Sequence, residues 1–233
     1  MGEIVTKPSL AIRVGYWSSI VILASGVGLI GGILASALFL PTALTTEWKG
    51  VEPYADAYRA SGGVITSLSF LAALVSCPAY VIQIGSIHSI NTSDSRRRVR
   101  LGLAFAVIFA TLAGLNYVVQ LSIVRARILS GQTEGLDWLV FQNPGSLMLA
   151  IDFVGWFFLG LAFLSAVPFF SGSRLNRSIR YLLTTVAVLG VVLLAGLATS
   201  NSAVGLVFLT TMSALLACAD VLILIFFRRL IRA

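Results

Sequence analysis

The sequence predicts an all-α protein, a polytopic membrane bundle of six transmembrane helices with both termini in the cytoplasm. One observation is composition: the mean hydropathy is +0.98, with 58% hydrophobic and 11% charged residues, outside the range of soluble domains. The second is that long apolar runs fill nearly the whole chain, and a bilayer core about 30 Å thick needs about 20 apolar residues per helix. The third is the uneven distribution of arginine between the connections.

The apolar runs predict six spans, which together form a single domain over residues 1–233. Each is expected to be a helix, because backbone polar groups in lipid must find their hydrogen-bond partners within the protein. The connection between the last two spans is very short, so these two should form a tight antiparallel hairpin. The predicted spans are 16–40, 63–88, 101–124, 146–170, 181–200 and 204–227.

Most basic residues fall in the connections on one side of these spans. Basic residues accumulate on the cytoplasmic side of membrane proteins, so both termini are predicted there, with the basic tracts contacting anionic headgroups. This distribution argues against a nucleic-acid partner, although the net charge is +7. The basic residues on that side are Lys7, Arg13, Arg96, Arg97, Arg98, Arg100, Arg174, Arg177, Arg180, Arg228, Arg229 and Arg232.

The two longer outer connections carry aromatic residues within short helical patterns. Residues 51–59 predict a short helix, in which Tyr54 and Tyr58, four residues apart, share one face. Asn143 and Pro144 predict the cap and the first residue of the helix of the fourth span. Anchoring at the membrane surface is one interpretation of these aromatic residues, and a lid over an outer cavity is the other.

Asp152 is the most informative polar residue, because it lies about two turns inside the fourth span, where a charge is costly. Asn116 and Gln120 of the third span lie at the same estimated height and, four residues apart, on one face. Tyr117 is adjacent to Asn116, and Trp156 lies one turn from Asp152. We predict that these five residues come together in the outer half of the bundle.

Two interpretations of this cluster remain open. It can line an outward-facing pocket for a small cationic or amphipathic ligand, with the amides and the carboxylate as polar contacts and the aromatic rings as walls. Glu134, Tyr54 and Tyr58 would then close over the ligand. Alternatively, the polar groups are an interhelical clamp in which Asn116 or Gln120 hydrogen-bonds to Asp152.

Asp220 and His88 form a candidate polar site nearer the cytoplasmic side. Asp220 lies two turns from the cytoplasmic end of the sixth span, and Arg228 or Arg97 could pair with it there. The alternative is a proton or cation relay with Asp152. His88, the single histidine, ends the second span, where a terminal residue interacting with the helix dipole is the simpler interpretation.

Gly28 and Gly32 form a GxxxG pair in the first span, which allows another helix to approach closely. Packing within the chain is the first interpretation. The alternative is a homodimer, or a contact with a partner membrane protein, through the same two glycines.

The sequence predicts no cofactor, no metal site and no catalytic residues. A metal site of familiar His/Cys spacing and the common hydrolase motifs are absent from the sequence, which argues against conventional hydrolysis. One histidine and two cysteines argue against haem or iron–sulfur ligation. Lys7 and Lys49 both lie outside the spans, which argues against a retinal-type Schiff base.

The segments 116–121 (NYVVQL), 131–135 (GQTEG) and 143–144 (NP) resemble an uncharacterised family of bacterial six-helix integral membrane proteins of unknown function. The resemblance covers under half of the chain, from the third to the fourth span. In it Asn116, Gln120 and Glu134 match, and Asp152 stands where a glutamate is expected. The resemblance implies the bacterial inner membrane as location, and it brings no activity.

Three functions follow from these features, in order of preference. The first is binding or transport of a small cationic or amphipathic molecule through the outer pocket. The second is an accessory or assembly subunit of a larger membrane complex, with the polar residues acting only as clamps. The third is a membrane enzyme that modifies lipids.

Overall fold

The computed structural model describes residues 9–39, 48–60, 63–90, 96–198 and 202–232, with side chains except at 33–39, 96, 196–198 and 202–210. This part of the chain contains helices, turns and no strand, so the predicted all-α class is confirmed. The helices are α1 (Leu10–Phe39), α2 (Val51–Ala60), α3 (Val64–Ile90), α4 (Arg96–Val119), the π-helix η1 (Gln120–Val124), α5 (Arg125–Leu129), the 3-10 helix η2 (Leu136–Trp138), α6 (Leu147–Ala166), the 3-10 helix η3 (Val167–Phe169), α7 (Arg174–Ala198) and α8 (Ser202–Arg232).

Within the described residues, five segments are long and apolar enough to cross a membrane, and they carry the first five predicted spans. The sixth predicted span falls on α8, whose side chains at 202–210 lie outside the described residues, so it stays a prediction. The hairpin connection at 199–201 lies outside them as well. The five segments are Leu10–Gly32, Val64–Ile90, Arg97–Leu129, Leu147–Phe169 and Arg174–Ala195.

Large apolar side chains cover the outer surface of the bundle. On α3, Val64, Leu68, Leu71, Val75 and Ile82 are each between 45% and 59% exposed, although the helix is packed on its other face. Contiguous apolar surface of this kind is rare on a soluble monomer, and it suits contact with lipid chains. Length, composition and exterior together indicate a membrane-embedded, multi-pass protein.

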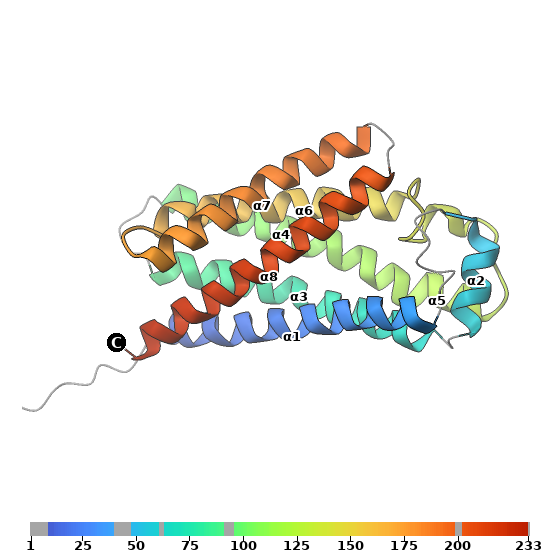
Figure 1. Ribbon diagram of the computed structural model, residues 1–233, viewed down its shortest axis with the longest axis horizontal. Helices are drawn as coiled ribbons and strands as arrows, with labels where there is room; N and C mark the ends of the chain where they lie inside the picture. The colour runs from blue at the N-terminus through green and yellow to red at the C-terminus, as the bar shows by residue number, and fades with distance from the viewer. Residues whose placement is uncertain (1–8, 40–47, 61–62, 91–95, 199–201, 233) are drawn as a thin grey trace, which may run out of the picture.

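The six long helices form a closed ring in chain order. Helix α3 packs against α1 and α4, α6 against α4 and α7, and α8 against α7 and α1. Figure 1 shows the long helices side by side, with α2 and α5 at one end of the bundle and the C-terminal end of α8 at the other. Buried side chains from the helices fill the centre, among them Ile84, Phe109, Phe163, Leu183 and Ile223.

Gly28 and Gly32 allow α1 to approach α3. A Cβ atom on Gly32 would lie 1.8 Å from Ser69 Oγ, and one on Gly28 would lie 3.1 Å from the Ala72 side chain. The pair therefore serves packing within the chain, as the first interpretation stated. A homodimer or partner contact through these glycines stays a prediction.

The predicted start of the helix of the fourth span was wrong by a few residues. Helix α6 begins at Leu147, and its cap is Ser146, whose side chain accepts a hydrogen bond from Leu149 N at 3.1 Å. The Asn143 side chain instead accepts from Gly145 N at 3.0 Å, which closes a turn before the helix. Asparagine caps helices and stabilises turns by the same type of hydrogen bond, so the sequence signal alone did not separate the two.

Helices α2 and α5 and the segment 130–146 form a small layer at one end of the bundle, which we call the outer cap. The predicted helix over residues 51–59 is confirmed as α2. A second cluster of buried apolar side chains, including Val51, Ala55, Ile128 and Leu136, holds the cap together. A hydrogen bond of 3.4 Å from the Arg59 side chain to the carbonyl oxygen of residue 128 joins α2 to α5.

Candidate functional site

The third predicted span changes its helical geometry at Gln120. Helix α4 ends at Val119, and the next turn, η1, is a π-helix of 5 residues that continues into α5. A π-helical turn inserts an extra residue into a helix and is frequent at functional sites. Here Gln120 begins this turn, and its amide still faces Asn116, because Gln120 Nε2 lies 3.4 Å from Asn116 Oδ1.

Asp152 of α6 lies at the centre of the predicted cluster and is 1% exposed. Its Oδ1 accepts a hydrogen bond from Asn116 Nδ2 at 3.2 Å, and its Oδ2 accepts one from Trp156 Nε1 at 2.8 Å. The Tyr117 hydroxyl lies near this carboxyl group and interacts with it electrostatically. The structure therefore brings together Asn116, Tyr117, Gln120, Asp152 and Trp156, which lie on two neighbouring helices.

Among the described residues, the Asp152 carboxyl group has hydrogen-bond donors but no salt-bridge partner. In the described part of the chain the single recorded salt bridge joins Arg59 and Asp56, at 2.7 Å on the exposed surface of α2. Both donors to Asp152 are neutral side chains. A charge buried in this way costs several kcal/mol, and neutral hydrogen bonds offset only part of that cost. A bound proton or another cation would neutralise the negative charge of Asp152.

The side chains of the cluster also fill the space between the helices. Asn116 is 0% and Gln120 2% exposed, and the described polar atoms of both are hydrogen-bonded within the chain. The Trp156 ring packs on Phe109 with centroids 5.5 Å apart. A ligand larger than a small cation would therefore have to displace side chains.

The outer cap reaches the cluster through backbone groups that sequence reasoning missed. Gln120 Nε2 donates to the carbonyl oxygen of Leu139 at 2.6 Å, and Gln120 Oε1 accepts from Phe141 N at 3.2 Å. One side-chain amide thus satisfies one acceptor and one donor of an irregular segment. No sequence signal marks such backbone partners, although an amide in a membrane span signals that partners exist.

The three residues expected to close over the site lie in the outer cap, with different roles. Tyr58 is buried, and its hydroxyl shares a hydrogen bond of 3.1 Å with Ser67 of α3. Tyr54 packs on Tyr58 with ring centroids 6.0 Å apart, and burial raises the pKa of its phenol well above the usual value. The Glu134 side chain is exposed and is not brought to the cluster, while its backbone oxygen accepts from Arg127 at 2.7 Å.

Asp220 of α8 is the centre of a second buried cluster, in the half of the bundle away from the outer cap. Its Oδ2 accepts a hydrogen bond from Tyr80 Oη at 2.9 Å, and its Oδ1 accepts one from Gln83 Nε2 at 3.2 Å. The expected ion pair with Arg228 or Arg97 is not formed, because both recorded partners of Asp220 are neutral. Sequence reasoning missed Tyr80, since 140 residues separate the two partners.

The hydrogen bond described for His88 is to a residue outside the Asp220 cluster. His88 Nε2 and the Ser165 hydroxyl of α6 share a hydrogen bond of 3.2 Å, and the His88 ring packs edge-on against Phe169 at 5.0 Å. A Cβ atom on Gly102 would lie 2.4 Å from His88 Nε2, so α4 comes close at this point. His88 thus joins α3, α4 and α6 rather than completing the Asp220 cluster.

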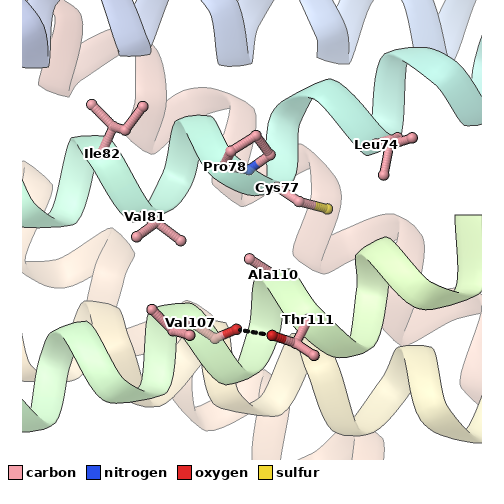
Figure 2. A pocket seen from close by; sticks show the side chains of 8 residues that line it. All are labelled: Leu74, Cys77, Pro78, Val81, Ile82, Val107, Ala110 and Thr111. Atoms are coloured by element: carbon pink, nitrogen blue, oxygen red, sulfur yellow. Dashed lines mark hydrogen bonds between the residues drawn. The ribbon is translucent and has the colours of Figure 1, made fainter. Parts of the chain in front are cut away.

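An open hollow of about 380 Å³ lies on the outer surface between α3 and α4, beside Pro78. Figure 2 shows that apolar side chains line it and that the Thr111 hydroxyl turns back to its own helix, where it donates to the Val107 oxygen at 2.9 Å. Nothing in this lining would orient a polar ligand. Because the neighbouring Ile82 and Val107 are about half exposed among lipid-facing side chains, the hollow suits acyl chains of the bilayer.

No protein-family model, curated protein or solved structure matches this chain, and the resemblance seen in the third and fourth spans stays an expectation.

Proposed function

We propose that this protein is a six-span protein of the bacterial inner membrane that binds or transports a small cationic molecule at Asp152. The observation that carries the proposal is a buried carboxyl group with two neutral donors and, among the described residues, no salt-bridge partner. In a membrane, a buried ionisable residue is by default a hypothesis for a functional site.

The proposed orientation places the outer cap outside and both termini in the cytoplasm. The starts of α1, α4 and α7 and the end of α8 carry the basic residues Arg13, Arg100, Arg180 and Arg229. With six antiparallel spans, all four ends lie on one side, where basic residues are expected. Asp152 is then reached from the outside, beneath the outer cap.

Entry of a ligand requires the outer cap to move. Gln120 holds the segment 139–141 over the cluster, and Trp156, which is only partly buried, supplies one wall. Breaking the two hydrogen bonds of Gln120 frees this segment together with the Gln120 amide. The freed amide oxygen and Asp152 then offer two acceptors for a cationic ligand.

The test is native mass spectrometry of the protein extracted gently from its own membrane. We expect a small molecule bound in a one-to-one ratio, lost from the Asn116→Leu and Asp152→Asn variants. The matched control is Asp137→Asn, which removes an exposed carboxylate of the outer cap and should keep the ligand. Unliganded wild-type protein, or a ligand that all variants retain, would contradict the proposed site.

A second function is favoured by a separate observation, namely that the polar atoms of Asn116 and Gln120 are satisfied within the chain. In this alternative the cluster is only an interhelical clamp, and the protein is an accessory subunit of a membrane complex. A co-purified polypeptide in the same mass spectra would support the accessory-subunit function. A loss of stability in Asp152→Asn would support the clamp.

A further inference from the structure

The Asp220 cluster joins three helices by neutral side chains. Asp220 comes from α8, Tyr80 and Gln83 from α3, and Ser19 from α1. Gln83 Nε2 lies 3.2 Å from Asp220 Oδ1 and 3.0 Å from Ser19 Oγ, so one amide group bridges α8 and α1. Ser19 in turn donates to the carbonyl oxygen of Gly15 at 2.8 Å, within its own helix.

Two features of this cluster are unusual for a purely structural contact. Asp220 is 1% exposed without a cationic partner, so its negative charge is not compensated. In addition, Gln83 is 0% exposed and its Oε1 has no hydrogen-bond partner. Buried acceptors in native proteins are rarely left unpaired, so an acceptor next to an uncompensated carboxylate needs an explanation.

We propose that Asp220 is a proton-binding site, and that the amide of Gln83 rotates when the proton binds. The proposal does not depend on the function suggested for Asp152. The ligand is a proton rather than a metal ion, because the side chains already lie within direct hydrogen-bond distance of one another.

Each protonation state has its own hydrogen-bond pattern. In the arrangement described, the ionised carboxylate accepts from Tyr80 Oη and Gln83 Nε2. When hydronium delivers a proton, an O–H bond forms at Asp220 Oδ1, water is released and the carboxyl group becomes neutral. Rotation of the Gln83 amide then places Oε1 opposite Asp220 Oδ1, where it accepts the new hydrogen, while Tyr80 continues to donate to Oδ2.

The rotation changes the contact between α3 and α1. After rotation Gln83 presents an oxygen to Ser19, so the Ser19 hydroxyl must turn its hydrogen from Gly15 toward Gln83. The Gly15 oxygen still accepts from Ser18 Oγ at 2.9 Å, so this change leaves it satisfied. Protonation of a residue on α8 is thereby transmitted to α1 through a single side chain on α3.

The titratable groups nearest to Asp220 lie on α3. These are Tyr80 itself and Cys77, one turn away. Helix α1 contributes Ser18 and Ser19, and within the described residues α7 supplies no recorded hydrogen bond or ion pair to Asp220. The Tyr80 ring is flanked edge-on by two phenyl rings, at 5.8 and 5.9 Å. Cys77 also interacts electrostatically with Asp152 of the other cluster.

Infrared difference spectroscopy of the purified full-length protein tests the proposal directly. We expect a C=O stretching band of a protonated carboxylic acid that shifts in D₂O and grows as the pH is lowered. The band should survive in Asp152→Asn, which removes the other buried carboxyl group, and be lost in Asp220→Asn. Gln83→Leu should shift the band to higher frequency, because the acid loses its amide acceptor.

Several results would overturn the proposal. A pH-independent spectrum in the carboxylic acid region, or a titrating band that Asp220→Asn retains, would exclude Asp220 as the proton acceptor. Replacing choline by sodium at constant pH should leave the band unchanged, and its loss would assign the site to sodium instead. If Asp220→Asn does not fold, Gln83→Leu decides alone, since an unshifted band would exclude the amide rotation.

Discussion

Gln120 and Leu139 join the outer end of the third span to the outer cap, through a hydrogen bond of 2.6 Å from Gln120 Nε2 to the Leu139 carbonyl oxygen. The same amide accepts from Phe141 N, so one side chain holds two backbone groups of an irregular segment. Gln120 begins the π-helical turn η1, and its neighbours in the polar cluster lie one turn earlier on α4. Gln120 therefore couples the outer cap to the Asp152 cluster by hydrogen bonds.

Replacing Gln120 by leucine should loosen the outer cap. The substitution leaves the part-buried Leu139 oxygen and Phe141 nitrogen without these partners, which costs about 2 kcal/mol. We expect a lower unfolding temperature in detergent micelles and faster hydrogen exchange at residues 139–141. Gln132→Leu is the matched control, because Gln132 is exposed in the same layer and should change neither measurement. Equal exchange in the two variants would show that Gln120 does not hold the cap.

The sequence predicted the Asp152 cluster because its signals are local and periodic. Asn116 and Gln120 lie one helical turn apart, and the connection between consecutive spans suggests that their helix is a neighbour of the one that carries Asp152. The Asp220 cluster was predicted less well, since Tyr80 is remote in sequence and an arginine seemed the natural partner for a buried carboxylate. Which side chains of two helices face each other depends on how each helix is rotated about its own axis, and a single sequence does not specify this rotation.

Boundaries and backbone contacts were harder to predict than the residue cluster. Asn143 was assigned as a helix cap, yet its side chain closes a turn, and Ser146 caps the helix instead. In a helix cap and in a turn, the asparagine side chain accepts the same type of hydrogen bond from a backbone N–H. The two alternatives shift the start of the helix by only a few residues. The bonds from Gln120 to the 139–141 segment had no sequence signature, because any residue type can supply backbone groups.

Gly63 is expected to be essential for the connection between α2 and α3. It has a φ of +63°, and a Cβ atom would lie 2.0 Å from the ring of Tyr58. Gly63→Ala combines backbone strain of about 1 kcal/mol with overpacking of about 2 kcal/mol, and should lower the unfolding temperature clearly. Gly131→Ala isolates the strain, because Gly131 has a φ of +75° and no atom near its Cβ position. Similar losses in both variants would mean that the Tyr58 contact contributes nothing.

Gly160 sets the distance between α6 and α7. A Cβ atom there would lie 3.0 Å from the Cα of Ala187, a backbone atom that cannot turn aside as a side chain would. Gly160→Ala should destabilise the bundle by about 2 kcal/mol through overpacking. In Gly31→Ala the new methyl group meets no atom within 4 Å, so stability should stay unchanged or rise slightly. Thermal unfolding in the same detergent compares the two, and equal stability would show that α6 and α7 can separate without cost.

The number of spans is tested by finding on which side of the membrane the C-terminus lies. The sixth span places the C-terminus in the cytoplasm, whereas a bundle with only the first five spans would leave it outside. A fluorescent protein fused after Ala233 should therefore fluoresce in a bacterial host, and alkaline phosphatase at the same position should be inactive. Phosphatase fused after Gln132, in the outer cap, should be active, and phosphatase fused after Gly172, between α6 and α7, should be inactive. Phosphatase activity at Ala233 together with inactivity at Gly172 would rule out the sixth span, because α7 alone would then carry the chain across.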